Sequence, residues 1–445
     1  MKKVITYGTF DLFHKGHFNL LKRAKALGDY LIVGVTSEYF DKSRGKFNVR
    51  DSLMKRIENV KATGFADEIV VEEYFGQKID DIKRYNADIF TVGSDWDGYF
   101  DYLNEYCKVV YLERTKGISS TQIRNSQNIR LGVVGNEIIL DRFLEELKFV
   151  SGIEIVGAFT ENDDKSGMKS KKFPGIENYQ TYEALLEHVD AVYIEAPLDL
   201  RANYMEKAIS AKKHILTEFP FCTDYNKARQ LIETAESNQI ILMEGLKTAY
   251  CPAFNKLIAL AKSGQIGRIL SMEANFTQIL GKSIDNQIRI AGGSMESLAA
   301  YPLLVIFKIL GLNYTHLDFV TYYENNVDMI TKMNFTFKNA MASSIVAINA
   351  KAEGDLVITG TKGYIYVPAP WWKTEFFEVR YEDVNKNRKY FYKFEGEGLR
   401  YEIVEFLNLI RSGQNSFLLT AEEILAESKA INSFLSHVNV KVLNC

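Results

Sequence analysis

The chain has 445 residues, more than a single hydrophobic core usually supports, so length alone predicts two or three domains. Hydrophobic residues make up 47% and charged residues 25%, and only 7 residues are proline, a composition that excludes disordered and fibrous classes. The net charge of −3 offers no overall basic field for nucleic acid or an anionic membrane, so neither is expected as a partner.

The cysteines show none of the short paired spacings that build zinc sites or disulfide frameworks, and no protein-held metal site is expected. They are Cys107, Cys222, Cys251 and Cys445. The first apolar run is too short for a signal peptide, and no uncharged stretch approaches the roughly 20 residues that span a bilayer. These features predict a protein of the reducing cytoplasm.

The first third of the chain alternates short β-branched runs with helical patterns, which is typical of a parallel sheet with crossover helices. The predicted strands are 3–7, 30–36, 68–71, 89–92 and 109–112. An amphipathic helix is predicted over 17–27 and a closing helix over 119–125. A polar break at 126–128 follows, so residues 1–126 are predicted to form the first domain.

A second α/β pattern begins at residue 129 and gives way to longer alternating strands from about residue 252. Its predicted strands are 129–134, 153–159, 191–195, 214–216 and 240–243, with helices over 138–149, 200–211 and 224–238. The last part is predicted to contain a helix over 253–263 and strands over 269–276, 329–337 and 340–349. The predicted fold class is therefore α/β, with a Rossmann-like first domain, a second Rossmann-type domain over 129–250, and an α+β domain with an open antiparallel sheet over 251–445.

The densest motif lies between the first predicted strand and helix, where residues 7–17 read Tyr-Gly-Thr-Phe-Asp-Leu-Phe-His-Lys-Gly-His. Nucleotidyl transfer needs cationic and hydrogen-bonding groups around a triphosphate, because charge moves onto the pyrophosphate leaving group. A strand-to-helix turn directs backbone N–H groups at that anion, Gly16 allows close approach, and His14 and His17 can donate to phosphate oxygens. The alternative is a pair of helix-capping histidines, although two of the six histidines lie within this one turn.

A second Gly-containing turn occupies residues 114–124, which read Arg-Thr-Lys-Gly-Ile-Ser-Ser-Thr-Gln-Ile-Arg. Hydroxyl groups at the start of the helix that follows suit phosphate binding, and Arg114 before them suits a second phosphate clamp. Ser119 taken alone is also explained as a capping residue.

With these motifs, the N-terminal part resembles the His-x-Gly-His nucleotidyltransferase superfamily, and within it the glycerol-3-phosphate cytidylyltransferases most closely. Two further segments match that family. The basic loop at 42–46 resembles its mobile lysine segment, and Gly-Ser-Asp-Trp at 93–96 resembles its Gly-Asp-Asp-Trp stretch, with Ser94 in place of the first Asp. Read without the family, the basic loop is equally well explained as a solvated charge run.

The resemblance implies Mg²⁺-dependent transfer of a cytidylyl group from CTP to a small phospho-polyol such as glycerol 3-phosphate. The CDP-polyol would serve teichoic acid or capsule synthesis. Catalytic roles are implied for His14, His17, Lys46 and Arg114. Nucleotide binding is implied for Gly8, Thr9, Phe10, Gly16, Asp95, Trp96, Ser119, Ser120 and Thr121. Substrate binding is implied for Asp11 and Arg56.

From residue 129 onward the chain resembles the Gfo/Idh/MocA oxidoreductases, through the segments 213–220, 244–252 and 292–302. Several family positions are changed. Glu137 stands where a glycine would let the backbone touch a pyrophosphate, so binding of NAD(P) is expected to be doubtful. Phe219 replaces the lysine of the family's Glu-Lys-Pro and cannot carry the proton that accompanies hydride transfer. Ser297 replaces an acidic residue, whereas Tyr301 is retained.

Three interpretations of this second part stay open. It reduces a keto-sugar phosphate with NAD(P)H before cytidylyl transfer, or it is a degenerate domain kept for assembly, or it binds a sugar phosphate without catalysis. Lys247 is a candidate replacement proton donor and, with Tyr301, forms a candidate second site; the alternative is that Lys247 is only solvated. A nucleotide-sensing scaffold is the non-catalytic alternative for the whole chain. Related modules of both families self-associate, so a homo-oligomer is expected.

Overall fold

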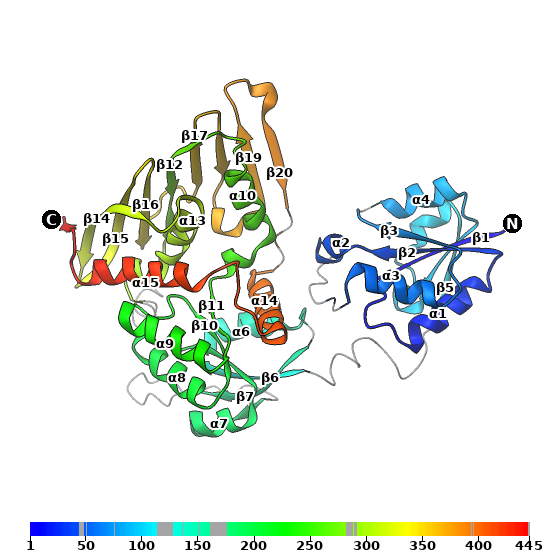
Figure 1. The fold of residues 1–445 in the computed structure, drawn as a ribbon, viewed down its shortest axis with the longest axis horizontal. Helices are drawn as coiled ribbons and strands as arrows, with labels where there is room; N and C mark the ends of the chain where they lie inside the picture. Colours follow the sequence, from blue (N-terminus) through cyan, green and yellow to red (C-terminus); the bar gives the residue numbers. More distant parts are fainter. Residues whose placement is uncertain are drawn as a thin grey trace. The chain divides into compact units, whose positions relative to one another are not determined.

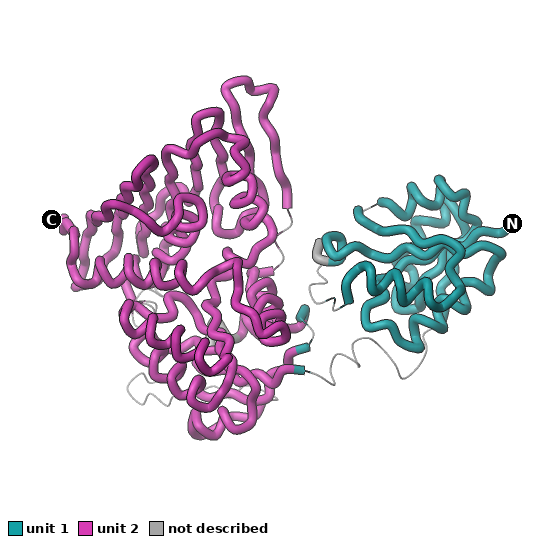
Figure 2. Tube along the Cα trace, in the orientation of Figure 1, with its two compact units in different colours: residues 1–128, 149–152 teal, residues 129–148, 153–445 magenta. Residues whose placement is uncertain are grey.

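The computed structural model describes residues 1–43, 49, 51–74, 76–113, 128–135, 137–150, 152–160, 176–281, 288, 292–392, 394 and 396–443, with backbone alone at 42–43 and 137–140. These residues divide into two compact units, residues 1–128 with 149–152 and residues 129–148 with 153–445 (Figure 2). No helix in the described ranges is long and apolar enough to cross a membrane.

The first unit contains a parallel sheet whose order, in its described residues, is β3-β2-β1-β4-β5 (Figure 1). The strands are β1 (Lys3–Gly8), β2 (Tyr30–Thr36), β3 (Glu68–Glu72), β4 (Ile89–Gly93) and β5 (Lys108–Leu112). The helices are α1 (Lys15–Lys25), α2 (Glu38–Ser43), α3 (Leu53–Ala62), α4 (Gln77–Tyr85), and the 3-10 helices η1 (Ser94–Trp96) and η2 (Asp101–Glu105). The strand order reverses between β1 and β4, and open α/β sheets bind ligands at the carboxyl ends of strands at such a point.

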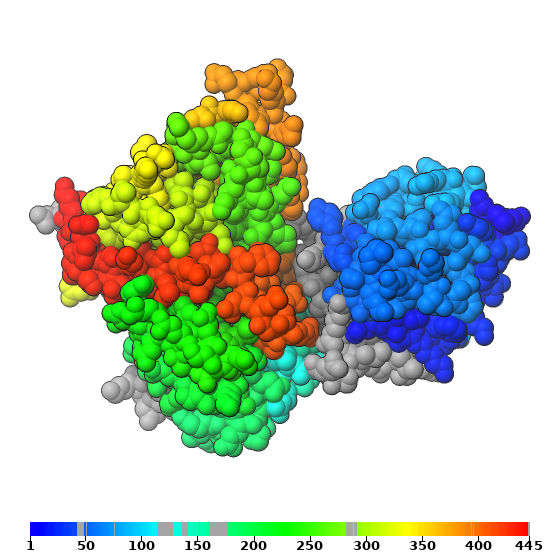
Figure 3. Space-filling view, viewed as in Figure 1, coloured from blue at the N-terminus to red at the C-terminus, as the bar shows by residue number. Residues whose placement is uncertain are grey.

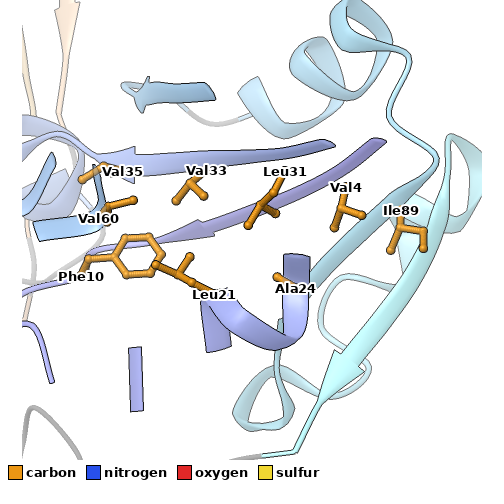
Figure 4. Close-up of a cluster of buried hydrophobic side chains, with 9 residues drawn as sticks. All are labelled: Val4, Phe10, Leu21, Ala24, Leu31, Val33, Val35, Val60 and Ile89. Atoms are coloured by element: carbon orange, nitrogen blue, oxygen red, sulfur yellow. The ribbon is translucent and has the colours of Figure 1, made fainter. Parts of the chain in front are cut away.

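Alternation along the strands gives this sheet two buried faces. Val4 of β1 and Leu31 and Val33 of β2 point to one side, where they pack with Leu21 of α1 and Val60 of α3 (Figure 4). The residues between them belong to a second cluster on the opposite face. Full burial of each such side chain contributes roughly 1.5–3 kcal/mol, so the strand ends that carry the motifs rest on a well-packed base.

The second unit begins with a parallel sheet in the order β11-β10-β9-β6-β7-β8 within its described residues. Its strands are β6 (Ile129–Gly135), β7 (Ile153–Phe159), β8 (Glu177–Asn178), β9 (Ala191–Glu195), β10 (His214–Glu218) and β11 (Leu242–Gly245). Its helices are α6 (Glu137–Leu147), α7 (Tyr182–His188), α8 (Leu198–Ser210), α9 (Tyr225–Ser237) and the 3-10 helix η3 (Lys247–Tyr250). The order reverses between β6 and β9, so the Rossmann-type prediction is confirmed.

A larger sheet completes the second unit, with the order β20-β19-β18-β17-β12-β16-β15-β14-β21 in the described residues and β13 beside β16. Its strands are β12 (Ile269–Ala274), β13 (Phe276–Gln278), β14 (Tyr314–Glu324), β15 (Val327–Phe337), β16 (Met341–Ile348), β17 (Leu356–Gly360), β18 (Tyr364–Val367), β19 (Phe376–Arg380), β20 (Arg388–Phe391) and β21 (Val440–Val442). The prediction of an antiparallel sheet is wrong at its centre, because β12 and β16 run parallel. The described residues between these strands include β13, helices at 294–298 and 300–310 and the β14–β15 hairpin, so the chain has room to cross over and enter in the same direction.

The remaining helices pack on these two sheets. Among the described residues they are α10 (Pro252–Lys262), α12 (Ser294–Leu298), α13 (Ala300–Leu310), the 3-10 helices η5 (Trp371–Lys373) and η6 (Val384–Lys386), α14 (Leu399–Ser412) and α15 (Ala421–Leu435). In Figure 3 the orange-red surface of α14 and α15 runs between the green surface of α8 and α9 and the yellow-green surface of the larger sheet. Thr420 and Glu423 form a capping box that fixes the start of α15. The helix pair thereby joins the Rossmann sheet to the larger one.

Candidate functional site

The turn between β1 and α1 brings the two motif histidines together. His14 is the N-cap of α1, and its Nδ1 accepts a hydrogen bond from the backbone N–H of Gly16 at 3.0 Å. The imidazoles of His14 and His17 stack with their centroids 4.0 Å apart. The first turn of α1 holds no acidic residue, so the partial positive charge of the helix N-terminus is not neutralised there. The capping interpretation is thus correct for His14, and the same turn also presents an anion-binding helix end.

The backbone before the histidines is held in a conformation that few residues adopt. Phe10 has φ of 54° and Leu12 has φ of 47°, both in the left-handed region. Phe10 is 1% exposed, so its ring anchors the turn in the hydrophobic core (Figure 4). The backbone N–H of Leu12 donates to the carboxylate of Asp51, and the N–H of Asp51 donates to Asp11. This strain is maintained by surrounding contacts, as is common at functional sites.

Arg56, a predicted substrate-binding residue, lies fully buried beneath this turn. Its Nη1 donates to the carbonyl of Thr9 at 2.9 Å and to that of Thr36 at 2.7 Å. It also faces Asp41, 3.4 Å away, which accepts from the Thr9 hydroxyl. Its Nη2 has no hydrogen-bond partner among the described residues and lies 3.9 Å from a carboxylate oxygen of Glu38. Arg56 therefore fixes the end of β1, and its direct contact with substrate stays a prediction, as does that of the buried Asp11.

A hollow with about 360 Å³ of empty space, its open mouth included, lies over the carboxyl ends of the strands. Gly8 and Thr9 from the end of β1 and Trp96 from η1 line it, so three residues predicted to bind nucleotide surround one space. Asp95, beside Trp96, is exposed at the rim. Phe10 and Gly16 lie in the turn between β1 and α1. The buried ring of Phe10 anchors this turn, and the backbone N–H of Gly16 donates to His14.

Sequence reasoning missed Lys78, which enters the same hollow from α4. Lys78 pairs with Glu72 at the end of β3 and lies 4.8 Å from the ring centroid of Tyr7 and 5.6 Å from that of Phe100. Burial, with the hydrogen bond to Asp81 next, raises the pKa of Tyr7, so the Tyr7 hydroxyl stays uncharged. A lysine on an amphipathic helix resembles a solvated residue in sequence, and no local signal distinguishes this one.

The other predicted site residues lie outside the described residues, and their roles remain predictions. They are Lys46, Arg114, Ser119, Ser120 and Thr121.

In the second unit, the described backbone fits a dinucleotide at the edge where β6 meets β9. A Cβ at Gly135 would lie 1.8 Å from the carbonyl oxygen of Glu195, so only glycine suits this turn. Helix α6 begins two residues later and directs its N-terminus to the same edge. Gly135 and the start of α6 are therefore the groups that would hold the pyrophosphate of NAD(P), whose nicotinamide supplies hydride chemistry when bound. The side chain of Glu137 lies outside the described residues.

The candidate second-site residues meet at the ends of the neighbouring strands. Tyr301 is buried and packs edge-on against Phe219, with ring centroids 4.8 Å apart. Arg201 holds the backbone after β10 by donating to the carbonyls of Glu218, Phe219 and Pro220. Lys247 opens η3 just after the neighbouring strand β11. Tyr301 thus contacts the residue that follows β10, and Lys247 lies at the end of the strand beside it.

A parallel sheet with a histidine pair at its first strand-to-helix turn and a hollow over its switch point defines a nucleotidyltransferase. Residues 5–126 match a family model described as cytidylyltransferase-like. The chain is 50% identical over 129 residues to the glycerol-3-phosphate cytidylyltransferase of Bacillus spizizenii, covering 28% of this chain and 95% of that protein. Through its first unit the chain belongs to the glycerol-3-phosphate cytidylyltransferase family, and the prediction of a cytidylyltransferase domain is confirmed.

The second unit carries a Gfo/Idh/MocA oxidoreductase domain, as predicted. Residues 129–246 match the family model described as oxidoreductase family, NAD-binding Rossmann fold. The chain is 31% identical over 216 residues, 47% of its length, to a dTDP-3,4-didehydro-2,6-dideoxy-alpha-D-glucose 3-reductase from Actinomadura kijaniata, covering 64% of that protein. A 3-ketoreductase from the same organism, solved with NADP and TDP-benzene, shares the fold with a TM-score of 0.63 at 22% identity, over 71% of this chain and all of that one. The family description favours binding of a dinucleotide. That Glu137 weakens this binding remains a prediction.

Proposed function

We propose that the first unit transfers a cytidylyl group from CTP to a small phospho-polyol of the glycerol 3-phosphate type. The observation that carries this proposal is the stacked pair His14 and His17 at the N-terminus of α1, next to the hollow lined by Gly8, Thr9 and Trp96. The name of the Bacillus spizizenii relative, at 50% identity, supports the same substrate. CTP would enter as its Mg²⁺ complex.

The chemistry follows from where charge develops. A phosphate oxygen of the polyol attacks the α-phosphorus of CTP, a new P–O bond forms, and the bond to pyrophosphate breaks. The attacking oxygen is already ionised at neutral pH, so no general base is needed. Negative charge grows on the leaving group, and donors that strengthen with that charge lower the barrier. His14 and His17, with the helix N-terminus, supply such donors on one side; Lys46 and Arg114 are proposed for the other.

The product would be a CDP-polyol and pyrophosphate, made in the cytoplasm for teichoic acid or capsule assembly by a homo-oligomer. We keep the division into a transferase part over 1–126, a Rossmann part over 129–250 and a sheet part over 251–445.

The test is to incubate the full chain with CTP, Mg²⁺ and a panel of polyol phosphates, and to measure pyrophosphate release. Release that depends on one small phospho-polyol is expected, together with a CDP-polyol detected by mass spectrometry. Nucleotide binding without release for every member of the panel would favour the sensing scaffold instead. Replacing CTP with ATP provides the matched control for the base.

A further inference from the structure

Two adjacent strand ends of the second unit carry Phe219, in place of the family's lysine, and Lys247. Strands β10 and β11 pair in parallel, with Glu218 opposite Gly245. Phe219 follows β10 at the position of the family's lysine, and Lys247 opens η3 just after β11. Both residues therefore follow the carboxyl ends of adjacent parallel strands. A lysine after β11 can then lie near the position that a lysine after β10 would occupy.

At the position of the family's lysine, the Phe219 ring begins a row of contacting aromatic side chains. The ring of Phe219 contacts Tyr301, and Tyr301 contacts Phe276 with centroids also 4.8 Å apart. Phe276 in turn stacks on Trp372 at 3.8 Å. None of these rings can donate an ammonium proton, and burial raises the pKa of the Tyr301 hydroxyl. A proton source for this space must come from another residue.

Lys247 has the properties of such a source. It is partly buried, yet its ammonium group makes no ion pair or hydrogen bond within the described part of the chain. Burial, with the nearby charge of Lys373 next, lowers the pKa of Lys247, whereas the carboxylates of Glu402 and Glu218 act in the opposite direction. A lysine that is only structural would be expected to hold a fixed partner, and a lysine on the open surface would not be desolvated.

Glu402 on α14 is the second unusual group. Its side chain is fully buried, and neither carboxyl oxygen has a hydrogen-bond partner among the described residues. A Cβ added to Gly245 would lie 3.5 Å from both oxygens, so the carboxyl group contacts the end of β11. An unsatisfied buried carboxyl group costs stability, and such a cost is typical of a site kept for function. Burial raises the pKa of Glu402, which favours its protonated form.

We propose that Lys247, supported by Glu402, is the proton donor of a carbonyl-reducing site at the ends of β10 and β11. When the carbonyl carbon of a ketone or aldehyde takes a hydride, the π electrons of the C=O bond move to oxygen. That oxygen takes a proton from Nζ of Lys247, whose N–H bonding pair stays on nitrogen and leaves a neutral amine. The amine is reprotonated through Glu402, which is a positioning residue and does not touch the substrate. A reduced nicotinamide is the hydride source.

This activity is separate from cytidylyl transfer, so either can fail alone. The first test needs no turnover: trace acetic anhydride labels the lysines of the full chain across a pH range, and peptide mass spectrometry reads each site. Lys247 is expected to reach half of its maximal labelling at lower pH than Lys256, which is exposed on α10. Equal midpoints for the two lysines would overturn the proposal.

The second test removes the lysine at position 247 and restores one at position 219. NADPH and NADH oxidation is followed with dihydroxyacetone phosphate, dihydroxyacetone and a panel of keto-sugar phosphates. Lys247→Met is expected to lower the rate by at least about 100-fold, the scale of a lost general acid. The double variant Lys247→Met with Phe219→Lys is expected to regain part of it. Calorimetric titration with NADPH shows whether each variant still binds the cofactor and is folded. No carbonyl-dependent oxidation in the wild type, or full activity in Lys247→Met, would overturn the proposal.

The role of Glu402 is tested through the pH profile of the same reduction. Glu402→Gln is expected to lower the pH at which activity is lost on the alkaline side, because Lys247 then lacks the carboxylate that favours its ammonium form. Glu405→Gln on the same helix keeps its hydrogen bond with Ser416 and is the matched control. An unchanged profile in Glu402→Gln would remove Glu402 from the proposed site.

Discussion

The imidazoles of His14 and His17 stack with their planes 24° apart, although only one of the two rings caps the helix. His14 accepts from Gly16 through Nδ1, so the neutral imidazole carries its proton on Nε2. His17 also packs against Phe10 and Phe13, whose ring centroids each lie 5.5 Å from its own. The pair is therefore rigid before any nucleotide binds, which is what transition-state stabilisation by fixed donors requires.

We predict that His14→Ala and His17→Ala each lower the rate of pyrophosphate release by at least about 100-fold, because each removes a donor that strengthens as leaving-group charge develops. The far-UV circular dichroism of both variants should match the wild type. Lys22→Ala, on the exposed face of the same helix, is the control and should keep full activity. Near-normal turnover in both histidine variants would contradict the proposed site.

A second prediction concerns Lys78, whose charge lies inside the hollow. Lys78→Met should raise KM for the phospho-polyol or CTP by about tenfold, because about 1.4 kcal/mol of charge-assisted binding is lost. The variant also leaves Glu72 without its cation, which adds repulsion toward anionic substrates. Lys83→Met, exposed on the same helix, provides the comparison. Equal KM values in the two variants would place Lys78 outside the substrate contacts.

The strands and the histidine turn could be predicted from sequence because both signals are local. Val4, Leu31 and Val33 alternate with residues of the opposite face, and the motif of 7–17 places glycine and histidine at fixed spacings around one turn. The predicted helix over 17–27 began late, since its true start at Lys15 depends on the cap formed by the His14 side chain. A histidine is not among the residues that usually signal a helix start.

The burial of three charged residues could not be predicted from sequence. Arg56, Lys78 and Glu402 all lie on helices, where a charged side chain is expected to face solvent. Tertiary packing decides otherwise: Arg56 meets the backbone carbonyls of two strand ends, and Glu402 meets the end of β11. Contacts between elements far apart in sequence leave no periodic signal. The crossover that makes β12 and β16 parallel escaped prediction for the same reason.

A third prediction follows from the buried carboxyl pair of Glu244 on β11 and Glu427 on α15. Burial raises the pKa of Glu244 to about 7, from an ordinary value of 4.5, and it also raises the pKa of Glu427. The folded state therefore binds a proton that the unfolded chain has released, and stability falls as pH rises from about 4.5 through 7. In the Glu427→Gln variant the side chain at position 427 cannot ionise, and its amide N–H can donate a hydrogen bond to Glu244.

Urea unfolding of the full chain at pH 5.5 and pH 8 measures this effect. The transition of the second unit should lose roughly 2 kcal/mol of stability through Glu244 between these conditions in the wild type, and less in Glu427→Gln. Glu422→Gln, exposed on the same helix, should behave as the wild type. A wild-type transition that becomes more stable toward pH 8 would show that the pair does not hold its proton in the folded state.

The last prediction concerns the turn after β6, where Gly135 keeps the backbone geometry of a dinucleotide site and Glu137 opens α6. A carboxylate at this helix N-terminus opposes a pyrophosphate that the helix dipole attracts by roughly 0.3–1 kcal/mol. Glu137→Gln removes the charge while keeping the size of the side chain, so NADPH should bind about two- to fivefold more tightly, as measured by calorimetric titration of the full chain. Asp141→Asn removes an equal charge one turn later on the exposed side of α6 and should change the affinity less. The gain in NADPH affinity should fall with distance from the N-terminus of α6. An equal gain in both variants would indicate only a change in net charge. Weaker binding in Glu137→Gln would mean instead that the carboxylate takes part in holding the dinucleotide.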